Sequence, residues 1–334
     1  MADYVHAESL VSTEWLAGRL EHPDLRVFDA TYHLPHLKRD ARAEYAAAHI
    51  PGAVFFDIDA IADKTTSLPH MLPPPGEFAA AAGALGVGDT TFVVIYDTYG
   101  LMSAARAWWM FRAYGFDKVA VLDGGFPKWK AEGRPVDNRP TVPPPRTFTP
   151  KFRPRVLRRK GDMMENLKTK AEQVVDARSS GRFKGTDPEP RAGLRSGHIP
   201  GSLSLPYGAL LDPKTQTVLP MDALRAQFAA ARVDLGRPTV TSCGSGVTAC
   251  VLAFGMHLAG SPQVAVYDGS WAEWGGRTDT EVVTGGRSLI DDRSHSIASV
   301  LRQEHRVIRR SSLEILGAAD RPKRVHRGLK PSQR

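Results

Sequence analysis

Two glycines flank a serine directly after one of the chain's two cysteines, in the segment Cys243-Gly244-Ser245-Gly246-Val247-Thr248-Ala249-Cys250. A short β-branched run precedes this segment, and an apolar stretch typical of a buried helix follows it. Glycines let the backbone curl so that successive N–H groups point inward at a helix N-terminus, where they bind negative charge. Such donors favour the thiolate form of a cysteine. We therefore expect Cys243 to be a nucleophile, and Cys250 to be a core residue two helical turns further on.

An anion-binding loop around a cysteine can serve phosphoester hydrolysis or sulfur chemistry. A cysteine phosphatase needs an arginine six positions after the nucleophile to bind phosphate with two hydrogen bonds. Ala249 occupies that position. The loop therefore favours a smaller charge centred on sulfur.

Several sequence landmarks occur twice, in the same order and at nearly the same spacing. Phe-Asp-Ala at 28–30 matches Val-Asp-Ala at 175–177, and His-Ile-Pro-Gly occurs at 49–52 and again at 198–201. Leu-Asp-Gly-Gly-Phe at 122–126 matches Tyr-Asp-Gly-Ser-Trp at 267–271. Repeats of this kind indicate a duplicated domain. The seven prolines between residues 133 and 154 predict an extended connector between the two copies.

Each copy alternates buried strands with helical patterns, which predicts parallel sheets with right-handed crossovers. Strands are expected at 92–96, 119–122, 239–242 and 264–267, and helices at 103–114 and 247–259. We predict an α/β fold of tandem three-layer α/β/α domains with parallel sheets and active groups at the carboxyl ends of the strands. The expected divisions are an N-terminal domain over 8–132, a Pro-rich linker over 133–158, a C-terminal catalytic domain over 159–276 and a basic extension over 277–334.

The composition is ordinary for a globular protein, with 42% hydrophobic residues in 334 and a net charge of +8. Residues 287–334 hold twelve basic and five acidic residues, so this segment carries +7 of the charge and the rest of the chain only +1. The nearly neutral body does not favour a nucleic-acid partner. No apolar run is long enough for a membrane span, and the first residues do not resemble a secretory signal, so we expect a cytoplasmic protein without a membrane partner. Two cysteines exclude a disulfide framework and a four-thiolate metal site, and we expect no metal and no organic cofactor.

The loop sequence CGSGVTA, the downstream YDGSWAEWG and the duplicated landmarks together resemble the two-domain rhodanese superfamily over about residues 8–276. The loop is similar to that of the 3-mercaptopyruvate sulfurtransferases in this superfamily. Thiosulfate sulfurtransferases of the same fold typically carry two basic residues after the cysteine, where this chain has Gly244 and Ser245.

The resemblance implies roles for residues in both halves. It assigns substrate binding to Arg182 and Arg191, because guanidinium groups suit the carboxylate and ketone oxygens of a 2-keto acid. The segments FFDID and HMLP are similar to family segments that contribute a proton relay, which here implies Asp59, His70 and Ser245. In this relay Asp59 orients His70, and His70 exchanges a proton through Ser245.

Other residues in the repeated segments are expected to be structural. Arg178 and Arg195 are expected to pair with acids such as Asp176 or Glu189. The histidines of the two His-Ile-Pro-Gly segments occur in both halves and are also expected to be structural. Aligning the strands puts Asp97 of the first half opposite Cys243, so the first half cannot carry a transferable sulfur.

The expected activity is transfer of sulfur from the 2-keto thiol 3-mercaptopyruvate, through a persulfide on Cys243, to a thiol acceptor such as thioredoxin or to cyanide, with release of pyruvate. The loop groups expected to hold the substrate and the outer sulfur belong to Gly244, Gly246, Val247 and Thr248. Two alternatives stay open: a thiosulfate:cyanide sulfurtransferase, and a persulfide carrier or thiol sensor that does not turn over.

Overall fold

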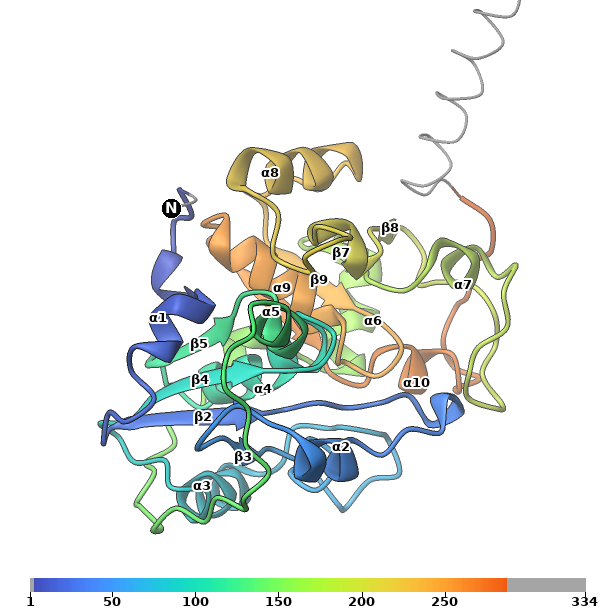
Figure 1. Ribbon diagram of the computed structural model, residues 1–334. Coiled ribbons are helices and arrows are strands. Elements are labelled where there is room, and N and C mark those ends of the chain that lie inside the picture. Colours follow the sequence, from blue (N-terminus) through green and yellow to red (C-terminus); the bar gives the residue numbers. More distant parts are fainter. Residues whose placement is uncertain (1–2, 287–334) are drawn as a thin grey trace, which may run out of the picture. The chain divides into compact units, whose positions relative to one another are not determined.

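The computed structural model describes residues 3–286. In it, the two halves of the chain form two five-stranded parallel sheets with equivalent strand orders (Figure 1). The first sheet has the order β1-β5-β4-β2-β3, with strands Leu10–Val11, Val119–Leu122, Phe92–Tyr96, Leu25–Asp29 and Val54–Phe55. The second has the order β6-β10-β9-β7-β8, with strands Leu157–Arg158, Val264–Tyr267, Thr239–Ser242, Gln173–Asp176 and Leu203–Ser204. The predicted duplication and the predicted parallel sheets are confirmed.

Helices cover both faces of each sheet, which gives the three layers expected from the strand–helix alternation. The first copy contains α1 (Thr13–Ala17), α2 (Ala41–Ala47), α3 (Pro75–Ala84), α4 (Ser103–Ala113) and α5 (Gly125–Ala131). The second contains α6 (Lys160–Thr169), α7 (Ser180–Lys184), α8 (Met221–Ala230), α9 (Ala249–Leu258) and α10 (Ser270–Trp274). Short 3₁₀ helices occur at Ala7–Ser9, Pro35–Leu37, Pro154–Val156 and Tyr207–Leu210.

The two copies share one continuous hydrophobic core. Helices α4 and α9, which follow equivalent strands, pack against each other across the boundary. Trp108 of α4 meets Phe254 of α9 edge-on, with 4.8 Å between the ring centroids. Because nearly every residue of both helices is buried, the copies cover each other's inner face.

The observed elements differ from the predicted ones at two places. Helix α9 begins at Ala249 rather than at residue 247, because Val247 and Thr248 complete the loop that precedes it. The last predicted linker residues, Leu157–Arg158, form an edge strand of the second sheet. The rest of the linker lies on the first copy, where the N–H of Lys151 donates to the carbonyl of Tyr114 at 2.7 Å and Phe148 is buried.

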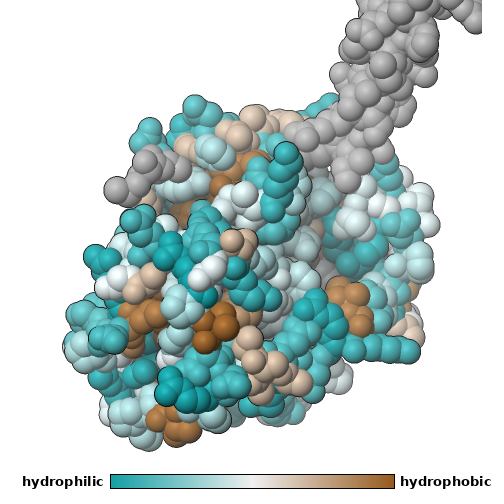
Figure 2. Space-filling model, viewed as in Figure 1, coloured by the Kyte–Doolittle hydropathy of each residue, from teal (hydrophilic) through white to brown (hydrophobic). Residues whose placement is uncertain are grey.

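The surface face in Figure 2 is mainly hydrophilic, and its hydrophobic residues lie in small separate groups. Among the helices of the described part, none combines the length and hydrophobicity that a bilayer span requires. The basic segment 287–334 lies outside the described residues.

Candidate active site

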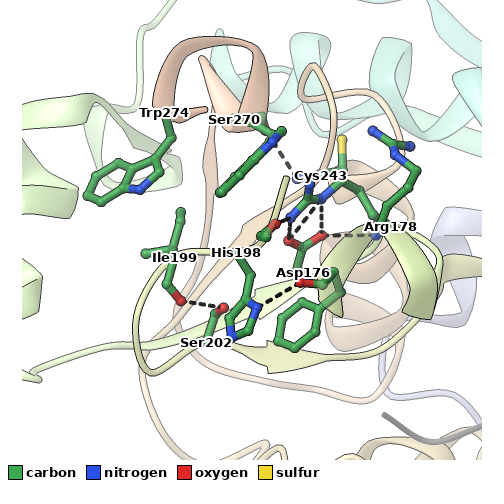
Figure 3. Close-up of polar contacts among 12 residues, drawn as sticks. Asp176, Arg178, His198, Ile199, Ser202, Cys243, Ser270 and Trp274 are labelled. Carbon is green, nitrogen blue, oxygen red and sulfur yellow. Dashed lines mark hydrogen bonds and ion pairs between the residues drawn. The ribbon is translucent and has the colours of Figure 1, made fainter. Parts of the chain in front are cut away.

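The loop after β9 is held by the first turn of α10. The Trp271 N–H donates to the carbonyl of Cys243 at 2.9 Å, and the Ala272 N–H donates to the carbonyl of Gly244 at 2.8 Å. The N–H of Cys243 itself donates to the Ser270 hydroxyl at 3.2 Å, and Figure 3 shows Ser270 beside Cys243. Since these carbonyls are engaged by α10, the following N–H groups are left for a ligand. Within residues 3–286, the N–H groups of positions 244–248 have no acceptor.

Gly246 is required by the shape of this loop. Its φ is +75°, in the left-handed region that favours glycine. A Cβ here would also lie 2.8 Å from the carbonyl oxygen of Asp268. Any side chain would therefore distort the loop.

The first copy contains the same loop with an anion of its own. Asp97 follows β4 as Cys243 follows β9, and α4 and α9 begin six residues after them. The Asp97 carboxylate accepts hydrogen bonds from the N–H groups of Tyr99, Met102 and Ala104 at 2.7–2.8 Å. Burial raises the pKa of Asp97, and these backbone N–H donors act against that rise, so the loop backbone itself favours a negative charge.

Cys243 lines a cavity of about 200 Å³ between the two copies, although only 1% of the residue is exposed. The first copy contributes Tyr32, Leu34 and Met102. The second contributes the loop and several flanking residues, namely Ala177, Arg178, Ser179, Arg182, Pro190, Arg191, Tyr207, Cys243, Gly244, Ser245, Val247 and Thr248. The predicted nucleophile and both predicted substrate-binding arginines thus lie on one cavity. Gly246 was also predicted to bind the substrate, but it does not line this cavity.

A buried glutamate holds Arg182 on the cavity wall. Arg182 Nη2 lies 2.6 Å from Glu189 Oε2, and Glu189 Oε1 accepts a bond of 2.7 Å from Arg178. Arg178 also binds Asp176 at 2.7 Å, a pair visible beside Cys243 in Figure 3. The side chain of Arg178 is fully buried and that of Glu189 is 1% exposed, so these two belong to the scaffold, as predicted for Arg178. Arg195 is structural too, but it binds the carbonyls of Trp274, Gly275 and Thr280 rather than an acid.

Arg191 contacts the loop and interacts with Tyr32 of the first copy. Its Nη2 donates to the Ser245 hydroxyl at 3.5 Å. Burial raises the pKa of the Tyr32 hydroxyl from the first copy, and the adjacent Arg191 guanidinium partly opposes this rise. The Tyr32 ring meets the His70 ring edge-on, at 4.7 Å between centroids.

His70 and Asp59 form the expected pair. Nδ1 of His70 lies 2.9 Å from Oδ1 of Asp59; the His70 side chain is 1% exposed and that of Asp59 is 61% exposed. Burial lowers the pKa of His70, although its contact with Asp59 acts in the opposite direction, and the same contact lowers the pKa of Asp59. Within residues 3–286 the short Nδ1–Asp59 contact does not have hydrogen-bond geometry, and Nε2 of His70 has no partner, so the link from His70 to Ser245 is not made.

No sequence pattern described above predicts that Tyr32, Glu189 and Arg106 belong to the site. Tyr32 stands three positions after Asp29, in the first of the repeated landmarks, and so occupies the position equivalent to Ser179. The sequence predicts Glu189 only as an ion-pair partner for arginines. Arg106 lies in an apolar helix, where a charged residue is itself a signal for a buried interaction.

The two histidines of the repeated segments are structural, as predicted. His49 Nδ1 contacts the carbonyl of Tyr45, and His198 Nδ1 contacts the carbonyl of Phe183, each at 2.7 Å. Cys250 is fully buried, and burial raises the pKa of its thiol to about 12, which suits a core residue. One group with metal-ligand spacing occurs within residues 3–286, His6 with Glu8 and His257, and none of these three lines the cavity.

Both halves of the chain match the model of the rhodanese-like domain, over residues 12–132 and 160–277. The chain therefore belongs to the rhodanese family.

Relatives named for two different activities are almost equally similar to this chain. Human 3-mercaptopyruvate sulfurtransferase is 45% identical over 86% of this chain and 99% of its own length. Bovine thiosulfate sulfurtransferase is 44% identical over 84% of this chain and 96% of its own length. The crystal structure of SseA from Escherichia coli, described as a 3-mercaptopyruvate sulfotransferase, superposes with a TM-score of 0.72 at 37% identity, over 79% of this chain and 98% of that one.

Proposed function

We propose that this protein is a sulfurtransferase that takes sulfur from 3-mercaptopyruvate and passes it to a thiol acceptor or to cyanide. The observation that carries the proposal is the shared cavity of Cys243, Arg182 and Arg191, with loop N–H groups at 244–248 that have no acceptor among the described residues. The relatives named for this activity support it. Thioredoxin is the protein acceptor we propose to test.

Gly244 supports a keto-acid donor over thiosulfate. A Cβ at this position would lie 2.9 Å from Nη2 of Arg182, so a larger residue would displace that guanidinium. The basic residues typical of thiosulfate sulfurtransferases would therefore compete with Arg182 for the same space. With glycine, Arg182 stays at the cavity, where it can bind the donor's carboxylate.

In the proposed reaction, the Cys243 thiolate attacks the sulfur of 3-mercaptopyruvate. An S–S bond forms, the C–S bond breaks, and the carbon leaves as the enolate of pyruvate. The enolate takes the proton that the donor's thiol gives up. In this proposal Ser245 and the His70–Asp59 pair carry that proton, which requires His70 to contact Ser245 once the donor is bound. An acceptor thiolate or cyanide then attacks the outer sulfur, which yields an acceptor persulfide or thiocyanate and restores the Cys243 thiolate.

A steady-state assay of pyruvate release from 3-mercaptopyruvate with cyanide tests this function, with thiosulfate as the competing donor. We expect the larger kcat/KM for 3-mercaptopyruvate, and loss of turnover in Cys243→Ser without loss of the fold. A Cys243→Ser protein that still releases pyruvate would refute the mechanism. A larger kcat/KM for thiosulfate would instead support a thiosulfate sulfurtransferase. Persulfide seen by mass spectrometry without turnover would indicate a sulfur carrier.

A further inference from the structure

Arg106 is a fully buried arginine of the first copy whose guanidinium group contacts the second copy. It belongs to α4, and its exposed fraction is 0%. Nη1 donates to Oδ1 of Asp268 at 2.7 Å and to the carbonyl of Gly246 at 3.4 Å, and Nη2 donates to the carbonyl of His70. One side chain thus touches the cysteine loop, the segment that carries His70, and an acid of the second copy.

Asp268 extends this contact to a second point on the same segment. Its other oxygen, Oδ2, accepts a hydrogen bond of 2.7 Å from the N–H of Leu72. Asp268 is 2% exposed and lies two residues before Ser270, whose hydroxyl accepts the N–H of Cys243. The turn that holds the cysteine loop therefore also holds the histidine segment.

The backbone of His70 adopts a conformation that needs such support. Its φ is +61°, in the left-handed region that non-glycine residues rarely occupy. Conformations of this kind persist where the surroundings over-determine them, and they gather at functional sites. Here the contacts of Arg106 and Asp268 fix the chain directly after the strained residue, at the His70 carbonyl and at the Leu72 N–H.

We propose that Arg106 is a positioning residue for the sulfur-transfer reaction. Paired with Asp268, it holds His70 in this conformation, beside Tyr32 and Asp59, and ties that placement to the cysteine loop. The inference rests on the proposed function. It makes catalysis depend on the contact between the two copies, because the pair that positions His70 is formed across their boundary.

The need to hold the two copies together does not by itself explain why an arginine is buried at their boundary. Their boundary already buries apolar pairs such as Trp108 with Phe254. A buried ion pair adds little net stability compared with apolar packing of the same volume, because both charges lose their hydration. A role in geometry explains why a charge is kept here.

The charge of Arg106 also gives a direct readout of its effect. The charged and titratable groups facing His70 are Asp59, Arg106, Arg191 and the hydroxyl-bearing Tyr32. Burial lowers the pKa of His70 most, Asp59 raises it, and the two arginines lower it further. Removing the charge of Arg106 should therefore raise the pKa of His70, whereas a purely structural loss of stability would not.

The test compares Arg106→Met, Arg106→Lys and Asp268→Asn with a matched control on the same helix, Arg112→Met. Arg112 is also paired, 2.7 Å from Asp117, but it does not line the cavity, and Asp117 keeps Arg153 as a partner. The measurements are kcat and KM for 3-mercaptopyruvate with cyanide, and the pKa of His70 from NMR of histidine-labelled protein, with His70→Gln to assign the signal.

We expect Arg106→Met to lower kcat about 10- to 100-fold, as for other displaced catalytic groups, to change KM much less, and to raise the pKa of His70. Arg106→Lys should recover part of the lost kcat. Arg112→Met should have the kcat and the His70 pKa of the wild type. A folded Arg106→Met protein with unchanged kcat and an unchanged His70 signal would overturn the proposal. Should that variant fail to fold, Asp268→Asn decides: a lowered kcat and a moved His70 signal support the proposal, and wild-type values of both overturn it. If the wild-type protein transfers no sulfur, the proposed function is wrong. The His70 signal in the NMR spectra of the variants still shows whether Arg106 positions His70.

Discussion

At the scale of single residues, the absence of a side chain at Gly244 leaves room for Arg182, the arginine that we propose binds the substrate. We predict that Gly244→Ala displaces the Arg182 guanidinium, because the new Cβ would lie 2.9 Å from Nη2. KM for 3-mercaptopyruvate should rise about tenfold, which corresponds to the loss of one charge-assisted hydrogen bond, with a smaller change in kcat. Steady-state kinetics measures both.

Gly161→Ala is the matched control for this substitution. It adds the same methyl group inside α6, where no atom lies within 4 Å of the new Cβ. This variant should keep wild-type kinetics and become slightly more stable, since alanine favours helix over glycine. Equal KM values for both variants would contradict the role given to Gly244.

The pH dependence of the reaction follows from the His70–Asp59 pair. Burial holds the pKa of His70 below 6.5, so the imidazole is neutral at pH 7 and gains a proton only under more acidic conditions. The acidic limb of the kcat profile should therefore lie below pH 6.5. Asp59→Asn removes the partner that raises the pKa of His70, so kcat should fall and the limb should move to still lower pH. If the acidic limb of the kcat profile moved to higher pH in Asp59→Asn, the His70–Asp59 pair would not be the source of the pH dependence.

At the scale of elements, one strand–loop–helix unit occurs in both copies, with Asp97 in the first and Cys243 in the second. The Asp97 carboxyl group accepts hydrogen bonds from three backbone N–H groups. We predict that Asp97→Asn lowers the free energy of unfolding by about 2–3 kcal/mol, because the amide nitrogen then faces buried donors. Urea unfolding measures this loss. Asp89→Asn serves as control, because Asp89 also accepts two hydrogen bonds but is exposed, and it should lose under about 1 kcal/mol.

Local patterns predicted these elements well. The strands 92–96, 119–122, 239–242 and 264–267 have the predicted bounds, because continuous β-branched runs need burial on both sheet faces. The start of α9 was placed two residues early, since Val247 and Thr248 are as apolar as the helix that follows them. Contacts such as Arg106 with Asp268 join residues 162 apart in the chain, and no local pattern encodes them. For the same reason the cavity wall contributed by Tyr32 was not predicted.

At the scale of the whole molecule, the candidate site exists only where the two copies meet. Cys243 and both arginines come from the second copy, and Tyr32 of the cavity wall comes from the first. Asp59 and His70 also belong to the first copy; they do not line the cavity, but the His70 ring contacts Tyr32. The carboxyl ends of the second sheet therefore need the first copy as a wall. The first copy, which has Asp97 where the second has Cys243, thus contributes part of the cavity wall.

Asp123 joins the two copies in a way that makes stability depend on pH. Its Oδ1 accepts a hydrogen bond of 2.8 Å from the N–H of Val218. Burial raises the pKa of this carboxyl to about 6. The folded state thus favours the protonated form, so the contribution of Asp123 to stability is greatest below about pH 4 and is lost as the pH rises through 6.

Asp123→Asn should remove this loss, because asparagine does not ionise and its carbonyl oxygen still accepts the Val218 N–H. The free energy of unfolding at pH 8, relative to wild type, should rise by up to about 2–3 kcal/mol, and the gain should shrink toward pH 4. Urea unfolding across this pH range measures the difference, with Asp222→Asn on the exposed side of α8 as the control. A gain that stays constant from pH 4 to pH 8 would show that ionisation of Asp123 is not its source.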